Sequence, residues 1–173
     1  MVMNEIRLVI PDESLLADAA AYKAEFTACG ESMDGSGMLR HQSPEEWLVT
    51  CQRLLSEETC PQGLVPATQF VCVNGEGRIV GMIDLRHRLN EHLAEFGGHI
   101  GYSVRPAERR KGYASRMLAM VLSEAEKLGF DRVLVTCNKG NEASRRTIER
   151  NGGRFEREAR DGDEIVLRYW INI

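Results

Sequence analysis

The chain has 173 residues, of which 43% are hydrophobic and 28% charged, and its formal charge is -4 at pH 7. This size fits one compact domain, and we expect residues 1–173 to form it. An acidic chain lacks the positive surface of a general nucleic-acid binder, no apolar run approaches the ~20 residues of a membrane span, and the N-terminus shows no secretion signal. We therefore expect neither nucleic-acid nor membrane partners.

The cysteines and histidines show no pattern of a metal or disulfide site. The five cysteines are widely separated without a Cys-x-x-Cys pair, and the four histidines lack the spacing of metal ligands. These features favour reduced thiols in a cytoplasmic protein and no metal. Cys137 is interpreted as a buried strand cysteine rather than a nucleophile, because the sequence shows no paired His and Asn arrangement near it.

The first third of the chain reads as a strand and two helices. Residues 5–10 predict a short strand, and Asp12 can cap a helix after it. The apolar positions of that helix fall on one face: Leu15, Ala19, Tyr22 and Phe26. A glycine-rich loop at 30–37 follows. Ser43-Pro44-Glu45-Glu46 has the Ser cap, first-turn proline and glutamate of a capping box, which predicts a second helix.

The remaining chain alternates strands and helices. Residues 68–86 predict an antiparallel hairpin that turns at 74–77. Strands at 99–104 and 132–137 flank a helix that starts near Ala114 and ends at Gly129, so they should be parallel. The last elements are a helix that Asn141 caps and that ends near Arg150, and strands at about 154–159 and 164–171. The expected class is mixed α/β, with a mostly antiparallel sheet, one parallel strand pair and flanking helices.

A basic turn, Arg109-Arg110-Lys111-Gly112-Tyr113-Ala114, precedes the central helix. Free N–H groups and the positive dipole end at a helix start attract phosphate, and Gly112 permits close approach of the backbone. The three cations can supply charge-assisted hydrogen bonds to a pyrophosphate. The same residues also fit a solvated basic loop. No Walker A or Gly-x-Gly-x-x-Gly pattern is present in the sequence, which argues against nucleotide hydrolysis and nicotinamide binding.

The basic turn resembles the Arg/Gln-x-x-Gly-x-Gly/Ala signature of the GNAT superfamily of acyl-CoA-dependent N-acetyltransferases, with Ala114 at the last position. In that family the signature follows a strand that ends in the acetyl-CoA cleft, the place of Tyr102-Ser103-Val104 here. Residues 138–152 look like the family's second segment, with Asn141 at its usual asparagine. The resemblance covers about residues 68–171. It implies the family's fold and direct acetyl transfer from acetyl-CoA to a primary amine of a small molecule, peptide or protein.

The resemblance also implies a cofactor site. Residues 109–115 should hold the pyrophosphate through backbone N–H groups, and the main chain of 102–104 should pair with the pantetheine arm. Asn141 should contact the pantetheine, a role compatible with capping the helix. Ser144 or Arg145 should reach coenzyme A, although Arg145 and Arg146 also fit a solvated face. The expected cofactor-binding residues are Tyr102, Ser103, Val104, Arg109, Arg110, Lys111, Gly112, Tyr113, Ala114, Ser115, Asn141, Ser144 and Arg145.

The residues that would move protons depart from the family pattern. Many members use a tyrosine seven residues beyond the asparagine as the acid for the departing thiolate, and Ile148 stands there. Tyr169 on the last strand is the candidate acid instead. Glu95 and His99, at the start of the strand that enters the cleft, are candidate bases, although each also fits an ordinary structural role. The fallback bases on the preceding strand are Asp84 and His87.

Two further features of the sequence leave alternatives open. The loop at 31–37 falls where the family builds its acceptor pocket, so Glu31 or Asp34 could hold a cationic amine, and a plain surface loop is the alternative. The isoleucine at 148 keeps open a non-catalytic acyl-CoA-binding sensor or interaction module. The exposed strand edges and the final strand leave a homodimer open.

Overall fold

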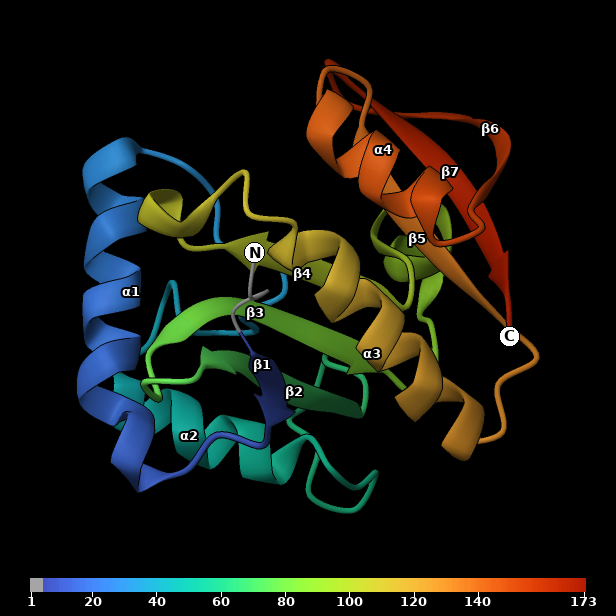
Figure 1. Cartoon of the computed structure of the whole chain (residues 1–173). Coiled ribbons are helices and arrows are strands. Elements are labelled where there is room, and N and C mark those ends of the chain that lie inside the picture. The colour runs from blue at the N-terminus through green and yellow to red at the C-terminus, as the bar shows by residue number, and fades with distance from the viewer. Residues whose placement is uncertain (1–4) are drawn as a thin grey trace.

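The computed structural model describes residues 5–173, which form one seven-stranded sheet with helices on both faces (Figure 1). The strands are β1 (Ile6–Val9), β2 (Ala67–Asn74), β3 (Ile79–Arg86), β4 (Ile100–Val104), β5 (Arg132–Asn138), β6 (Arg154–Asp161) and β7 (Glu164–Asn172). The α-helices are α1 (Leu16–Cys29), α2 (Pro44–Arg53), α3 (Tyr113–Lys127) and α4 (Glu142–Arg150). The sheet order β1-β2-β3-β4-β5-β7-β6 confirms the expected mixed α/β class.

Two helix starts follow directly from capping side chains. At α2, Ser43 Oγ accepts a hydrogen bond from Glu46 N at 3.2 Å, and the Glu46 carboxylate accepts one from Ser43 N at 2.9 Å. This is the capping box that the sequence predicts. At α4, Asn141 Oδ1 accepts a hydrogen bond from Ser144 N at 3.0 Å. Both caps satisfy helix N–H groups that would otherwise lack partners.

The first helix starts later than the sequence suggests. Asp12 does act as a cap, but its carboxylate accepts from Ser14 N at 2.9 Å and caps a short 3-10 turn at 13–15. α1 begins after this turn, at Leu16. A side chain that bonds the N–H group two residues ahead favours such a tight turn. The apolar face of α1 is otherwise as predicted.

The one parallel pair of the sheet is β4 and β5, which α3 connects as expected. These strands share the single register position Ile100–Val135, whereas β4 pairs with β3 as far as Val104. Beyond Ile100 the two strands separate (Figure 1). The edge of β4 that faces β5 therefore has no strand partner within residues 5–173 from residue 101 onward. The sheet is split at the carboxyl ends of its two central strands.

Apolar cores lie on both faces of the sheet. On one face, α3 buries Met117, Leu118 and Val121 completely against the strands. On the other, α1 and α2 bury Tyr22, Phe26 and Trp47. Because burial of such side chains stabilises a fold by roughly 1.5–3 kcal/mol each, the two layers hold the helices firmly against the sheet.

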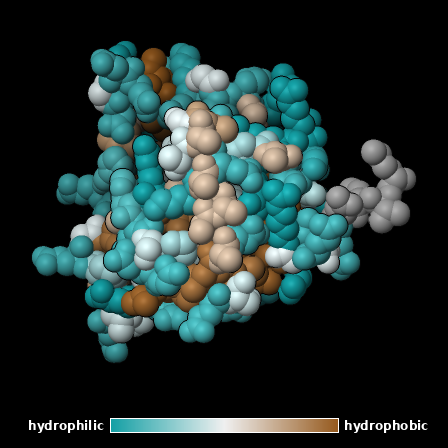
Figure 2. All heavy atoms as spheres, turned by 90° about the vertical axis from the view of Figure 1, so that its left-hand side faces the viewer, coloured by the Kyte–Doolittle hydropathy of each residue, from teal (hydrophilic) through white to brown (hydrophobic). Residues whose placement is uncertain are grey.

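The outer surface on the α1 side is mainly hydrophilic, with short apolar stretches among polar residues (Figure 2). The exposed large apolar side chains of the described residues are spread over several elements: Ile10, Val49, Leu55, Leu128, Phe155 and Ile173. Single exposed apolar residues of this kind are normal at protein surfaces. Within residues 5–173, no helix combines the length and the apolar character that crossing a membrane requires.

A buried ion cluster around Arg105 ties α1 to the end of β4. The Arg105 side chain is 2% exposed; its Nη1 donates to Asp18 Oδ1 at 2.8 Å and its Nε donates to Glu25 Oε1 at 2.7 Å. Nη1 also donates to the carbonyl of Ile79 at 2.9 Å. Loss of one partner from such a cluster leaves buried charge without compensation. The cluster thus fixes the helix that leads into the 30–37 loop.

Replacement of this cation should measurably destabilise the protein. We expect Arg105→Met to lower the free energy of unfolding by about 2–3 kcal/mol, less than for a fully buried pair because both carboxylates keep some contact with water. Urea denaturation followed by circular dichroism measures the change. Arg88→Met, which removes the surface pair of Arg88 with Glu57, is the control and should leave the midpoint unchanged. Equal midpoints for the two variants would contradict the role of Arg105.

Candidate active site

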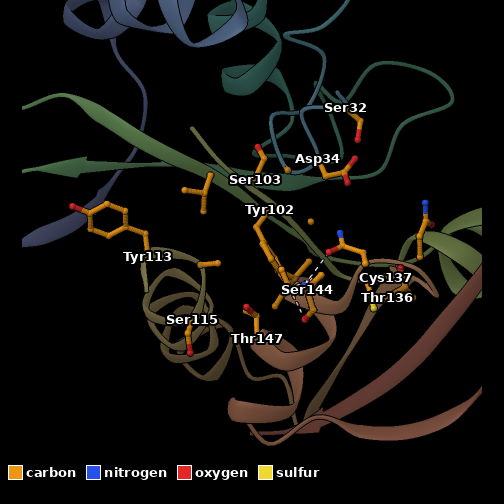
Figure 3. Close-up of a pocket in the computed structure, with 18 of the residues that line it drawn as sticks. Ser32, Asp34, Tyr102, Ser103, Tyr113, Ser115, Thr136, Cys137, Ser144 and Thr147 are labelled. Atoms are coloured by element: carbon orange, nitrogen blue, oxygen red, sulfur yellow. Dashed lines mark hydrogen bonds between the residues drawn. The ribbon is translucent and has the colours of Figure 1, made fainter. Parts of the chain in front are cut away.

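The gap between β4 and β5 opens into a cleft of about 1090 Å³. Its walls come from the α1–α2 loop, β4, the β4–α3 loop, the start of α3, the end of β5 and α4. Figure 3 shows Tyr102 in the middle of these elements, between β4 and α4. The volume lies at the upper end of that of small-molecule sites, which in open sheets lie beyond the carboxyl ends of strands. The cleft is therefore the candidate active site.

Most of the predicted cofactor residues meet in this cleft. β4 contributes Tyr102, Ser103 and Val104, and α4 contributes Asn141 and Ser144. From the basic turn and the start of α3, the lining residues are Arg109, Arg110, Gly112, Tyr113, Ala114 and Ser115. Segments that are distant in sequence are thus brought together around one space.

The start of α3 presents backbone donors to the cleft. Arg110 and Gly112 have φ angles of 63° and 77°, so the chain makes a left-handed turn before the helix begins at Tyr113. Arg110 is the one non-glycine residue of the described chain with positive φ, a costly conformation that recurs at ligand sites. No side chain within residues 5–173 caps α3, so its first N–H groups remain available to an anion.

The cations of the basic turn differ in their surroundings. Arg109 Nη2 donates to Glu31 Oε2 at 2.5 Å, and its guanidinium lies 5.6 Å from the centre of the Phe26 ring. The hydrogen bond from Arg109 lowers the pKa of Glu31. Lys111 donates to Glu108 Oε2 at 2.7 Å and is not among the described residues that line the cleft. Arg109 and its partner Glu31 therefore both line the cleft, whereas Lys111 only contacts the lining residue Glu108.

α4 brings cationic residues to the cleft that the sequence reasoning did not select. Arg146 and Arg150 both line it. Their i, i+4 spacing places them on one helix face, which is a signal that the sequence carried. Arg145, the expected contact, lies outside the lining residues of the described chain and pairs with Glu142 at 2.7 Å and Glu149 at 3.5 Å.

The glycine-rich loop is docked rigidly against β4. Gly35 has φ 73°, and a Cβ atom built there would lie 2.2 Å from the carbonyl oxygen of Gly101, so a side chain cannot fit. Gln69 Nε2 donates to the Gly35 carbonyl at 2.7 Å, and Trp47 Nε1 donates to the Ser36 carbonyl at 2.8 Å. The loop thus forms a fixed wall of the cleft and is not a plain surface loop.

This loop carries Asp34 into the cleft on the side opposite α4, next to Ser32 (Figure 3). Burial raises the pKa of Asp34, an effect that the Ser32 hydrogen bond and the charge of Arg86 oppose and the charge of Asp84 adds to. A carboxylate whose pKa is raised in this way accepts a proton more readily than an ordinary carboxylate does. Asp34 is therefore the acidic residue of the cleft best suited to accept a proton.

Glu95 and His99 are held in contacts outside the cleft lining. The exposed Glu95 carboxylate accepts two hydrogen bonds from Arg157, at 2.7 and 2.8 Å, which lower its pKa. His99 Nδ1 accepts a hydrogen bond from Leu134 N at 2.9 Å, and its ring packs edge-on against Phe130. Burial, together with the charge of Arg86, lowers the pKa of His99 to about 4. Neither residue belongs to the described residues that line the cleft.

The other proton-transfer candidates also make structural contacts. Tyr169 is 3% exposed and packs against Phe155. Asp84 Oδ1 accepts a hydrogen bond from Gly101 N at 3.0 Å, and its other oxygen pairs with Arg86 at 3.3 Å. His87 Nε2 lies 2.8 Å from the Thr68 hydroxyl. Among the residues that the structure describes, the cleft lining includes none of these three candidates.

Two further positions bear on the chemistry. Cys137 lines the cleft at the end of β5, and burial raises the pKa of its thiol to about 11, so it keeps its proton at neutral pH. Ile148, at the position of the family's usual tyrosine, is 0% exposed. Neither side chain is prepared for proton transfer.

Known acetyltransferases have the same fold. A structure of the ribosomal-protein alpha-N-acetyltransferase RimL in complex with coenzyme A matches with a TM-score of 0.72 at 18% identity, over 97% of this chain and 94% of that chain. RimJ from Mycobacterium smegmatis, in complex with CoA-disulfide, matches with a TM-score of 0.68 at 23% identity, over 96% and 81%. A chimera of the spermidine N-acetyltransferase SpeG from Vibrio cholerae matches with 0.67 at 13%, over 96% and 95%.

Comparison at the sequence level gives the family. No curated protein is similar to the chain in sequence at a significant level. The family model described as the acetyltransferase (GNAT) domain matches residues 12–154. This match extends over most of the chain and includes the basic turn, the split between β4 and β5, and α4. The chain therefore belongs to the GNAT acetyltransferase family.

Proposed function

We propose that the protein transfers the acetyl group of acetyl-CoA directly to a primary amine of a small molecule, peptide or protein. The observation that carries the proposal is the cleft, in which the uncapped start of α3 lies beside the unpaired edge of β4. An anion-binding helix start and a free strand edge match a molecule that joins a pyrophosphate to an arm with amide groups. Coenzyme A has this composition.

In this arrangement the N–H groups of residues 110–115 bind the pyrophosphate. Arg109, Arg146 and Arg150 supply charge-assisted hydrogen bonds to phosphate oxygens. The free edge of β4 at 102–104 pairs with the pantetheine amides as a neighbouring strand would. Asn141 and Ser144 contact the end of the arm. The side chains of Lys111, at the pyrophosphate, and of Arg145, along α4, remain sequence-based predictions of contacts with coenzyme A.

The amine reacts only in its neutral form, so its ammonium form must first lose a proton. We propose that Asp34 accepts this proton. Asp34 lines the cleft, and burial raises the pKa of its carboxyl group. In its ionised form the same carboxylate attracts the cationic amine. In this role we prefer Asp34 to Glu95 and His99, because the Glu95 carboxylate is engaged with Arg157, His99 Nδ1 accepts a hydrogen bond from Leu134 N, and neither residue is among the described residues that line the cleft. Tyr169, Asp84 and His87 keep the structural contacts described above.

Calorimetric titration with acetyl-CoA, combined with thiol release against a panel of amines, tests the proposal. The panel includes peptide α-amines and spermidine, because the names of structural neighbours cite an alpha-N-protein acetyltransferase and a spermidine N-acetyltransferase. Saturable binding with amine-dependent thiol release is the expected result. Tight binding without release would favour the acyl-CoA-binding sensor, for which Ile148 is the supporting observation, and absence of binding would contradict both.

The same proposal includes the location, the partners and the oligomeric state of the protein. We infer a cytoplasmic location, where separated thiols such as these five stay reduced, with no nucleic-acid, membrane or metal partner. Residues 1–173 would act as a single domain. A homodimer through the exposed strand edges is compatible with this function, and light scattering in solution would detect it.

A further inference from the structure

Departure of the thiolate needs a proton donor that position 148 does not supply. Ile148 is fully buried, and a Cβ atom built at Gly153 would lie 2.4 Å from its Cγ2 atom. The Ile148 side chain is therefore packed tightly against the turn that follows α4. A free thiolate is a poorer leaving group than a protonated or hydrogen-bonded sulfur, so a donor elsewhere in the cleft would speed the reaction.

Tyr102 reaches into the cleft from the opposite wall. Its side chain leaves β4 toward α4, and its hydroxyl oxygen lies 2.6 Å from Ser144 Oγ and 3.3 Å from the Ser144 carbonyl (Figure 3). Ser144 and Ile148 are one helical turn apart on α4. The Tyr102 hydroxyl thus lies against the α4 face on which Ile148 also lies, and it comes from a different strand.

The surroundings of the phenol suit a proton donor. Burial raises the pKa of Tyr102, and the hydroxyls of Ser144 and Thr147 oppose this effect by hydrogen bonding. The phenol therefore keeps its proton throughout the neutral range. When it gives the proton up, the hydroxyls of Ser144 and Thr147 can stabilise the phenolate by hydrogen bonding. The positive end of α4, at Asn141 to Ser144, adds to this stabilisation.

We propose that Tyr102 is the catalytic residue that protonates the departing sulfur, and that Ser144 positions its phenol; this role rests on the acetyl transfer proposed above. The amine nitrogen forms a bond to the acetyl carbon, and the carbon–sulfur bond breaks with its electron pair on sulfur. The Tyr102 O–H proton passes to that sulfur. The phenolate, held by Ser144 and Thr147, regains a proton from water, and the proton of the former amine leaves through Asp34. Each bond and charge is thereby accounted for.

Tyr102→Phe removes the hydroxyl and keeps the ring. We expect kcat for the best amine acceptor to fall about 10²-fold, with KM for acetyl-CoA unchanged within about twofold, because general acid catalysis contributes roughly 10²–10⁴ to a rate. Ser144→Ala should lower kcat less, and the double variant should be no slower than Tyr102→Phe, because the two residues act as one unit. Tyr22→Phe is the control. It removes a different buried phenol, which hydrogen-bonds Ser103 of β4 through the carbonyl at 3.1 Å and the hydroxyl at 2.9 Å, and should keep kcat.

A second measurement does not depend on turnover. Ultraviolet absorbance of the thiolate, followed against pH in the complex with coenzyme A, gives the pKa of the bound thiol. In the wild-type protein we expect this pKa to lie below that of free coenzyme A, and in Tyr102→Phe to return toward it, because the phenol donates a hydrogen bond to the thiolate form. A structural role for Tyr102 would leave the thiol pKa unchanged.

The two measurements separate the possible failures. If wild-type protein turns over amines and Tyr102→Phe retains both kcat and the thiol pKa, the role of Tyr102 is wrong and the acetyltransferase function stands. If wild-type protein turns over no amine but Tyr102→Phe still shifts the thiol pKa, the contact with sulfur stands and the catalytic function fails. If neither turnover nor a shift is found, both proposals are overturned.

Discussion

Gly112→Trp should weaken binding of acetyl-CoA by at least about 100-fold, which corresponds to roughly 2.8 kcal/mol. Gly112 lies at the left-handed turn before α3 and lines the cleft, and a Cβ atom built there meets nothing within 4 Å. An indole would therefore project into the space that the pyrophosphate needs beside the free N–H groups. Calorimetric titration with acetyl-CoA measures the loss.

The matched control is Gly77→Trp. Gly77 has φ 79°, close to the 77° of Gly112, and it also has nothing within 4 Å of a built Cβ atom. It lies in the β2–β3 turn and is not one of the described residues that line the cleft. Both substitutions introduce a similar backbone strain, so a difference between the two variants in affinity for acetyl-CoA must come from the place of the tryptophan in the fold. Equal affinities for the two variants would mean that the pyrophosphate binds elsewhere.

Asp34→Asn should lower kcat for amine acetylation by about 10²–10³-fold, because the amide keeps the shape of the side chain and cannot accept the proton. In the wild-type protein, kcat/KM should rise with pH as Asp34 ionises, through a pKa that burial places above its usual value. The variant should lose that rise. A pH profile of initial rates measures both effects, and Glu57→Gln, at an exposed surface ion pair, is the control.

The same substitution should make the protein more stable above the pH range in which Asp34 ionises. Because the pKa of Asp34 is raised in the folded state, the folded protein binds more protons than the unfolded chain between the two pKa values. Stability from this group is therefore fully present below the unfolded pKa and is lost as pH rises through the folded pKa. The amide of the variant carries no such charge, so its urea midpoints should exceed those of the wild type above that window. A lower midpoint would contradict a raised pKa of Asp34 in the folded state.

Local chemistry explains what could be predicted from the sequence. The capping residues Ser43 and Asn141, the apolar stripes of the helices and the glycine at 112 act within a few residues of themselves, so their structure can be inferred without knowing the fold. Alternation of strand and helix predicted the parallel β4–β5 pair. These signals were sufficient for the class of fold, and they predict the phosphate site at the turn before α3.

The proposed acid and base of the site depend on contacts between distant segments. Asp34 lines the cleft because Gly35 packs on Gly101, and no sequence pattern near residue 34 reveals this contact. The side chain of Tyr102 can take part in the proposed chemistry because α4 lies opposite β4, which brings the Tyr102 phenol to Ser144. Glu95 had a suitable sequence position, yet Arg157, on another strand, engages its carboxylate. Charge and distance in three dimensions decide these roles.

The single register position between β4 and β5 also determines how the backbone exchanges protons with solvent. The edge of β4 that faces β5 has no strand partner beyond Ile100 within residues 5–173, so it lacks the hydrogen bonds to a neighbouring strand that slow amide exchange in the interior of a sheet. Its amides should therefore exchange quickly in the free protein and slowly once a ligand arm lies along the strand. The sheet thus keeps one strand edge without a neighbouring strand, and deuterium uptake along β4 would record when a ligand arm occupies that edge.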